Sequence, residues 1–204
     1  MLLHAAEFTD LELRRRDGFY NVRGRFPYNK PAVLSDGGRT GRPRKEIIAP
    51  RAFAYRVNDP AEDIHFLLGH SYDKPLASKL TQTLSFEDTA AALNFEAKIL
   101  PAVADTSHGA DALALIETGL AVGISPGFRI PPKRAVAEAE TVAHEGMRPN
   151  EGAYNAIIRT VWQALLYEIS LVTRPAYPES QVEARSWDVS ELASPNNPMK
   201  RWRL

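Results

Sequence analysis

Apolar residues in this chain occur in short runs that alternate with polar residues, and this pattern restricts the fold more than any other feature of the sequence. In residues 93–99 (LNFEAKI) every second residue is apolar, as in a β-strand with one buried and one solvated face. Fifteen prolines and twelve glycines separate such runs, which favours strands joined by loops over a bundle of helices. A length of 204 residues suits one domain with a sizeable core.

The composition excludes several classes of function. Lys plus Arg and Asp plus Glu both number 25, so the net charge gives no reason to expect a specific nucleic-acid partner or an anionic membrane surface. The absence of cysteine excludes disulfides, a thiolate nucleophile and sulfur-ligated zinc. No apolar run approaches the roughly 18 residues of a membrane span, and acidic Glu7 comes too early for a secretory signal. We therefore expect a soluble, unexported protein with no membrane partner.

The elements expected along the chain follow from these runs and from the turn residues between them. We expect one domain over residues 1–186, followed by an extended C-terminal tail over residues 187–204. In the first half of this domain we expect a hairpin over 11–28 turning at Asp17–Gly18, a basic mobile loop at 29–45, a helical turn at 53–57, a strand at 64–68 and a hairpin of strands 83–87 and 93–99. In the second half we expect a helix over 111–118 capped by Thr106 or Ser107 and ended by Gly119, a mobile loop at 133–152, strands at 156–162 and 165–173, and a short strand at 181–185.

Three side chains stand out because of where they fall in this pattern. Ser125 follows an apolar strand just where Pro126 and Gly127 predict a turn, so it is either a serine held at the end of a rigid strand or part of an ordinary turn. His70 comes just after the strand at 64–68 and is free to act, although such loop histidines are usually surface residues. Glu168 lies inside an apolar strand, where an unpaired charge is costly. It should therefore have a partner, unless it faces water on an edge strand.

Together these side chains make the set that a serine hydrolase requires. A serine hydroxyl is too weakly acidic to attack unaided, a neutral imidazole can accept its proton, and an acid can orient that imidazole and stabilise its cation. In the 165–173 strand, alternation places Tyr167, Ile169 and Leu171 on one face and Glu168 with Leu166, Ser170 and Val172 on the other.

Five segments, taken in order, resemble the prohead proteases of tailed bacteriophages, a family of capsid maturation serine proteases that is similar to the herpesvirus assembly proteases. The matching pieces are Glu46–Phe53, Leu67–Leu76, the helix ending at Gly119, Val122–Phe128 and Tyr167–Pro178. They cover most of residues 18–182.

The resemblance implies a β-rich α+β fold, a single closed or partly closed β-barrel flanked by a few short helices. It also implies an endopeptidase that acts without a cofactor or metal, with Ser125 as the nucleophile, His70 as the base and Glu168 as the third member. Related viral proteases use a second histidine in that third place, so His65 and Asp73 are the alternatives. A carboxylate would hold the His70 cation more strongly than a second histidine would.

Pro126 departs from the commoner family pattern, in which the residue after the serine has a backbone N–H. Because proline has none, it cannot help to bind the oxyanion. Gly127, Arg129 or a loop elsewhere must supply the oxyanion or substrate contacts instead, although such an arginine is more commonly a solvated or salt-bridged residue.

The expected substrates are the major capsid protein, through its scaffolding segment, or a separate scaffold protein, cleaved inside the assembling prohead in the host cytoplasm. Self-cleavage in the basic loop 39–45 or in the tail, and a homodimer, are further expectations. Two alternatives remain open from the sequence. One is a catalytically silent head component that binds capsid or scaffold on the same barrel, and the other is a hydrolase of a non-peptide ester.

Overall fold

The computed structural model describes residues 11–16, 19–39, 41–121 and 123–173 of the chain. Its elements in order are β1 (Glu12–Arg16), β2 (Phe19–Pro27), β3 (Pro31–Ser35), β4 (Arg44–Ile48), α1 (Ala54–Asn58), β5 (His65–Leu68), β6 (Ser71–Ser78), β7 (Leu84–Asp88), β8 (Ala92–Ile99), α2 (Pro101–Ala104), α3 (Ser107–Glu117), β9 (Gly123–Arg129), β10 (Glu140–His144), β11 (Met147–Arg148), a 3₁₀ turn (Pro149–Glu151), β12 (Ala153–Tyr154), β13 (Ile157–Val161) and β14 (Leu165–Val172).

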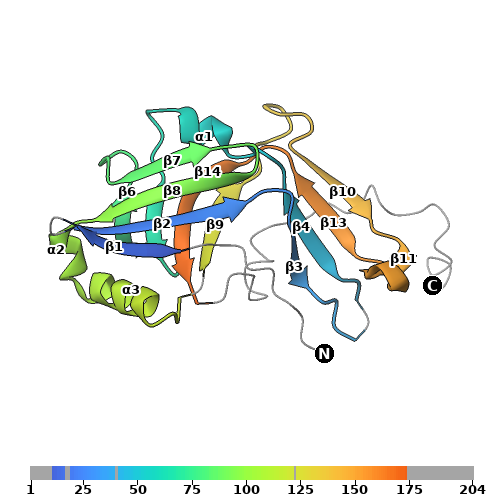
Figure 1. The fold of residues 1–204 in the computed structure, drawn as a ribbon. Coiled ribbons are helices and arrows are strands. Elements are labelled where there is room, and N and C mark those ends of the chain that lie inside the picture. The colour runs from blue at the N-terminus through green and yellow to red at the C-terminus, as the bar shows by residue number, and fades with distance from the viewer. Residues whose placement is uncertain (1–10, 17–18, 40, 122, 174–204) are drawn as a thin grey trace, which may run out of the picture.

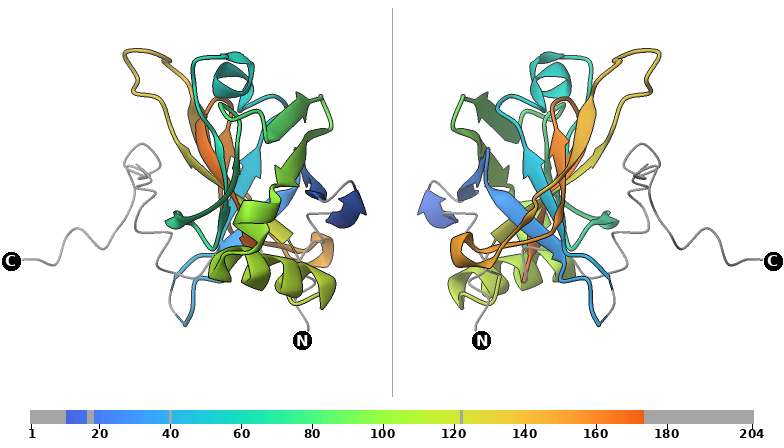
Figure 2. Two further views of the ribbon diagram at one scale, coloured as in Figure 1. Left: turned by 90° about the vertical axis from the view of Figure 1, so that its left-hand side faces the viewer. Right: turned by 90° about the vertical axis from the view of Figure 1, so that its right-hand side faces the viewer.

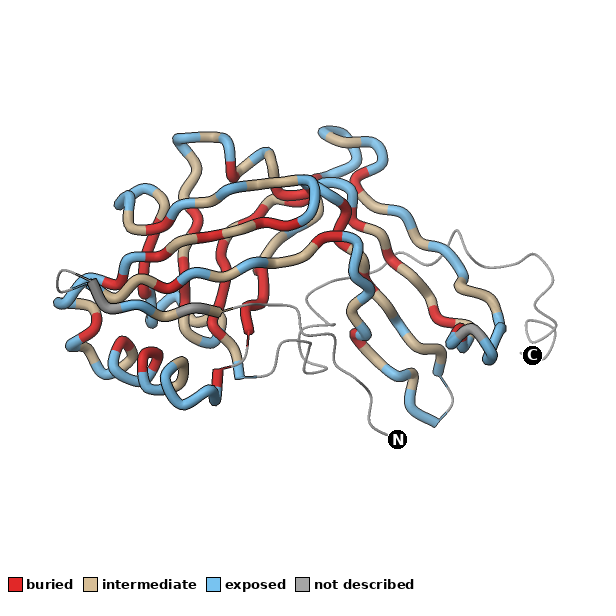
Figure 3. Tube along the Cα trace, in the orientation of Figure 1, coloured by how far each residue is buried: buried red, intermediate tan, exposed pale blue. Residues whose placement is uncertain are grey.

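Two four-stranded sheets face each other across the main core. One has the order β1-β2-β8-β7 and the other β6-β5-β14-β9, and their strands cross steeply in Figure 1. Phe66 of β5 and Phe95 of β8 meet between them, with ring centroids 5.4 Å apart. Figure 3 shows that buried residues concentrate on the strands of these two sheets. The predicted alternation in 93–99 is confirmed, because its apolar residues are buried and the residues between them are partly or fully exposed.

The described residues form a β-rich fold with a few short helices, but none of the sheets formed by these residues closes into a barrel. The predicted closed or partly closed barrel is therefore wrong. Two strands of the β6-β5-β14-β9 sheet each contain a proline, Pro75 in β6 and Pro126 in β9. Because proline has no N–H to donate, these strands are poorly suited to carry a ladder on both sides. They are accordingly the edge strands of their sheet.

A third sheet, with the order β10-β13-β4-β3, stands beside these two layers (Figure 1). Both segments predicted as mobile loops contain strands. β3 and β4 of this sheet begin within 29–45, while β10 of this sheet and β11, which pairs with β12 in a separate two-stranded sheet, lie within 133–152. Two basic residues of the predicted loop also form polar contacts. Arg42 donates hydrogen bonds to Asn155 and Ala156, and Lys45 pairs with Glu145. A simple solvated basic loop is therefore the wrong description of this segment.

The helices are short and lie at the margins of the two facing sheets. Helix α1 matches the predicted turn, whereas α3 begins earlier than predicted, at Ser107. Thr106 caps its N-terminus by accepting a hydrogen bond from Gly109 N at 3.1 Å. Gly119, with φ +69°, follows its C-terminal end. Figure 2 shows α2 and α3 across one end of the two sheets.

Several predictions fall on residues that the structure does not describe. These are the turn at Asp17–Gly18, the strand at 181–185, the domain boundary at 186 and the tail at 187–204. The hairpin that the turn would close is confirmed, because β1 pairs with β2 in antiparallel register from Arg16–Phe19 onward. In the described ranges, every helix is too short or too polar to cross a membrane.

A buried ion pair in the third sheet gives a stability prediction. Arg159 of β13 is 3% exposed and donates to Glu46 at 3.1 Å and to Glu140 at 2.6 Å. Arg159→Ala would leave Glu46 buried without this cation, so we expect it to lower the free energy of unfolding by about 3–5 kcal/mol. Urea unfolding measures this directly. The control is Arg23→Ala, which removes the exposed Arg23–Glu96 pair and should cost less than about 1 kcal/mol. Equal costs for the two variants would contradict the prediction.

Candidate functional site

His70 is held at the end of β5 by a tight turn. Gly69 and His70 have φ +64° and +61°, and Leu68 pairs with Ser71 across them, as in the two-residue hairpin turns that require positive φ at both positions. The His70 N–H donates to Ser170 Oγ at 2.9 Å. The predicted position of His70, just beyond the strand, is confirmed, and this bond fixes its backbone to β14.

The His70 side chain contacts Glu168. Nδ1 lies 2.8 Å from Glu168 Oε1, and Glu168 Oε2 accepts from Ser170 Oγ at 2.5 Å. A carboxylate can only accept, so Nδ1 is the donor and the neutral ring keeps its lone pair on Nε2. This is the tautomer that a general base oriented by a carboxylate needs.

Glu168 has the partner that its burial required. Its side chain is 6% exposed, and β14 is an inner strand between β5 and β9, so the alternative of a water-facing edge residue is wrong. The contacts with His70 and Ser170 satisfy both carboxylate oxygens, which offsets the cost of removing the charge from water.

A β-bulge in β14 changes which side chains share its faces. The register shifts between Leu166 and Glu168, so Leu166 is opposite Phe128 and buried in the core, whereas Glu168 is opposite Gly127. The prediction that Leu166 shares the face of Glu168 is therefore wrong, because strict alternation allows no inserted residue. Tyr167, predicted to share a face with Ile169 and Leu171, instead lies against the guanidinium groups of Arg56 and Arg129.

Ser125 lies inside β9 and not at its end. The strand continues through Pro126 and Gly127 to Arg129, so both the predicted strand end and the alternative of an ordinary turn are wrong. An edge strand tolerates a proline, which explains how it continues.

The strand register places Ser125 on the face of the sheet that carries Glu168. Ser125 pairs with Ser170, and Gly127 pairs with Glu168, in the antiparallel ladder between β9 and β14. Side chains directly opposite each other share a face, with Cβ atoms about 4.5–5.5 Å apart. Ser125 is 8% exposed. Within the described residues it is not hydrogen-bonded to His70, and the bond between base and nucleophile often tightens only when substrate binds.

Gly127 provides the space in which the Glu168 carboxylate lies. A Cβ at this position would be 1.8 Å from Glu168 Oε1 and 2.6 Å from its Cδ, well inside any real contact distance. A side chain here would displace the carboxylate that His70 contacts. The sequence had indicated Gly127 for a different reason, as a backbone donor. That contact, like the one expected of Arg129, requires a bound substrate and stays a prediction.

The two alternatives to Glu168 do not contact His70 in the described structure. His65 Nε2 is 3.4 Å from Asp63 Oδ2, and its ring meets the edge of Tyr72 at 5.7 Å. Asp73 is exposed on β6. Sequence reasoning missed Ser170, whose hydroxyl bridges His70 and Glu168. The signal was its position two residues after Glu168 on the same face of the strand.

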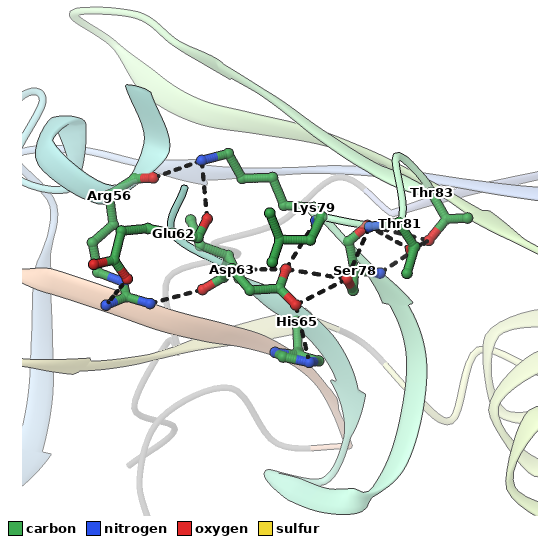
Figure 4. Close-up of polar contacts among 10 residues, drawn as sticks. Arg56, Glu62, Asp63, His65, Ser78, Lys79, Thr81 and Thr83 are labelled. Atoms are coloured by element: carbon green, nitrogen blue, oxygen red, sulfur yellow. Dashed lines mark hydrogen bonds and ion pairs between the residues drawn. The ribbon is translucent and has the colours of Figure 1, made fainter. Parts of the chain in front are cut away.

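A second cluster contains the same types of residue but a different arrangement. Asp63 accepts from Ser78 Oγ at 3.1 Å and lies beside His65 (Figure 4). The carboxylate is between the hydroxyl and the imidazole, so His65 is not placed to take the proton of Ser78. Asp63 also accepts from Leu80 N at 3.0 Å. The cluster therefore joins the end of β6 to the start of β5.

Tyr72 lies near the candidate site and is affected by its charges. Partial burial raises the pKa of its hydroxyl, and the negative charge of Glu168 raises it further, while Arg56 and Arg129 oppose the increase. The phenol is thus a neutral hydrogen-bond donor at ordinary pH. No group of three or more potential metal ligands occurs among the described residues.

An imidazole oriented by a buried carboxylate, with a serine on the neighbouring strand and on the same face, is the residue set of a serine hydrolase. Comparison with known protein families matches residues 32–195 of the 204 to the caudovirus prohead serine protease family. The chain belongs to this family, which confirms the resemblance. No curated protein and no solved structure gives a significant match.

Proposed function

We propose that this protein is a serine endopeptidase that cleaves capsid and scaffold proteins inside the prohead during head maturation. Ser125 is the nucleophile, His70 the general base and Glu168 the orienting acid. The observation that carries the proposal is the partly buried contact between His70 Nδ1 and Glu168 Oε1, 2.8 Å long, on the face of the sheet where Ser125 lies. Family membership supports the same reaction class.

The reaction follows from the tautomer of His70. Nε2 accepts the proton of Ser125 as Oγ attacks the scissile carbonyl carbon, and the imidazolium is stabilised by the Glu168 carboxylate. His70 then gives this proton to the leaving amine, so the peptide C–N bond breaks and an acyl-enzyme remains. Water, deprotonated by His70, releases the acid product and restores Ser125.

Ser125 is not hydrogen-bonded to His70 and is nearly buried, and this observation favours one other function. In this second function the chain does not hydrolyse substrate and serves as a silent head component that binds capsid or scaffold. The two functions differ in one measurable result, the appearance of cleaved head proteins.

The test mixes the purified full chain with its capsid precursor or scaffold protein and follows the products by mass spectrometry. We expect defined cleavage products, and no products after treatment with a fluorophosphonate. Intact head proteins after prolonged incubation would exclude the protease and leave the silent component. Fluorophosphonate labelling without any cleavage would point to a non-peptide ester as the substrate. The same spectra show whether the enzyme cuts itself, and a full-length chain in an aged, active sample would exclude self-cleavage.

The remaining parts of the proposal concern where and with what the enzyme acts. The substrate is the scaffolding segment of the major capsid protein or a separate scaffold, and the enzyme is packaged with it inside the prohead in the host cytoplasm. Recovery of the protein from proheads, compared with free cell extract, tests the location. A homodimer stays a prediction, which sedimentation of the purified chain tests.

A further inference from the structure

Arg129 is the last residue of β9 and belongs to the face of the sheet that carries the candidate site. Alternation along β9 places Ser125, Gly127 and Arg129 on one face. Arg129 is four positions beyond Ser125 along the strand, which is roughly 13 Å between their Cα atoms. Arg129 is exposed, so its guanidinium is accessible to a molecule that crosses this face.

Two guanidinium groups lie against the ring of Tyr167, the residue that precedes Glu168 in β14. Cζ of Arg56 lies 4.2 Å from the ring centroid and Cζ of Arg129 lies 5.4 Å from it. Both distances are within the range of cation–π attraction. The β-bulge at Tyr167 puts this ring out of the core, and thereby holds the Arg129 side chain on a rigid aromatic surface.

The two arginines differ in how their charge is balanced. Arg56 forms an ion pair with Glu62 at 2.5 Å and donates to Asp63 O at 2.9 Å (Figure 4), and its side chain is 12% exposed. Arg129 has no ion-pair partner or hydrogen bond in the described part of the chain. The guanidinium of Arg129 is thus accessible near the candidate site and forms no ion pair with any carboxylate of the described residues.

Tyr72 adds a neutral donor to the same neighbourhood. It is 58% exposed, its ring lies at the edge of His65, and Glu168, Arg56 and Arg129 all act on its hydroxyl. A carboxylate arriving here would meet a guanidinium and a phenol O–H, both of which can donate to it.

We propose that Arg129, held on the Tyr167 ring, binds an Asp or Glu side chain of the substrate two to four residues from the scissile bond. This inference rests on the proposed function and names the substrate feature that the site selects. A guanidinium presents paired N–H donors that match a carboxylate, which Lys or a neutral side chain cannot reproduce. An extended substrate advances about 3.3 Å per residue. The Arg129 side chain can reach back over part of the roughly 13 Å that separates the Cα atoms of Ser125 and Arg129. The remaining distance corresponds to two to four residues of an extended substrate.

The experiment measures kcat and KM on synthetic peptides that span a cleavage site mapped in the capsid precursor or scaffold. Glu, Gln and Lys are placed in turn at each of four positions on both sides of the scissile bond. With the wild-type enzyme we expect Glu to exceed Gln by about 10-fold in kcat/KM at one position, mostly through KM, as for a charge-assisted hydrogen bond worth roughly 1.5 kcal/mol. Arg129→Gln should remove this preference, and Arg129→Glu should reverse it in favour of Lys.

The control variant is Arg25→Gln, which removes one exposed arginine from β2 in the other sheet and should keep the preference. Cleavage by the wild-type enzyme with no difference between Glu and Gln at any position overturns the inference alone, as does a preference that Arg129→Gln leaves unchanged. If the wild-type chain cleaves neither peptides nor head proteins, the proposed function fails and the inference fails with it.

Discussion

Ser125→Ala is expected to abolish cleavage of the head proteins, with kcat lowered by a factor on the order of 10⁴ or more, as when a serine protease loses its nucleophile. The reason is chemical, because alanine has no oxygen to form the acyl-enzyme. The change removes one buried hydroxyl from β9 and no described hydrogen bond, so we expect the fold to be preserved.

The measurement is the rate of product formation from the capsid precursor or scaffold, with circular dichroism to show that the variant is folded. Ser85→Ala, which removes an exposed serine of β7, is the matched control and should retain full activity. His70→Ala should lose nearly as much as Ser125→Ala, and the double variant should lose no more than either, because the two residues act as one unit. Cleavage by folded Ser125→Ala at more than a few per cent of the wild-type rate would show that Ser125 is not the nucleophile.

Gly127→Ala is expected to lower kcat by about 10³–10⁴, close to the loss caused by Glu168→Gln, because the orienting carboxylate of a triad has effects of this size. The new methyl group would lie 1.8 Å from Glu168 Oε1, so the carboxylate must leave its position beside His70. In Glu168→Gln the amide can donate to Nδ1, which favours the tautomer with the proton on Nε2 and removes the base. We expect the Gly127 change also to cost about 1–3 kcal/mol of stability through overpacking.

A double-mutant cycle separates this effect from general destabilisation. If Gly127 acts through Glu168, then Gly127→Ala in the Glu168→Gln background should cost little further activity. Gly119→Ala is the control, since a Cβ there meets no atom within 4 Å, although its positive φ makes it mildly destabilising. Independent, multiplicative losses from Gly127→Ala and Glu168→Gln would contradict a role of Gly127 through the carboxylate.

The strands whose signal is local could be predicted from the sequence. The alternation in 93–99 gave the faces of β8 because one side is buried over its whole length. In the third sheet, β13 matches the strand expected at 156–162, but the other three strands could not be predicted in this way. β3, β4 and β10 are stabilised by pairing with β13 or with each other, and β4 pairs with β13 from more than a hundred residues away. A short stretch of sequence does not indicate which distant strand it will pair with.

The candidate site was predictable where a residue type is costly in its surroundings. A charge in the apolar run around Glu168 required a partner, and the structure places it against His70 and Ser170. Ser170 itself was missed because a small hydroxyl in a strand has no such cost. The role of Gly127 was missed because it depends on the space above β9, which the Glu168 carboxylate occupies. The bulge at Tyr167 was missed because alternation assumes an uninterrupted ladder.

The most direct test of the account is to find which serine a fluorophosphonate modifies. The full chain is labelled, digested and mapped by peptide mass spectrometry, in the wild type and in His70→Ala. The account predicts an adduct on Ser125 that forms in the wild type and is at least 100-fold slower in His70→Ala, since the base that activates the hydroxyl is gone. An adduct on Ser78, the serine beside Asp63 and His65, or labelling of Ser125 that does not depend on His70, would contradict it.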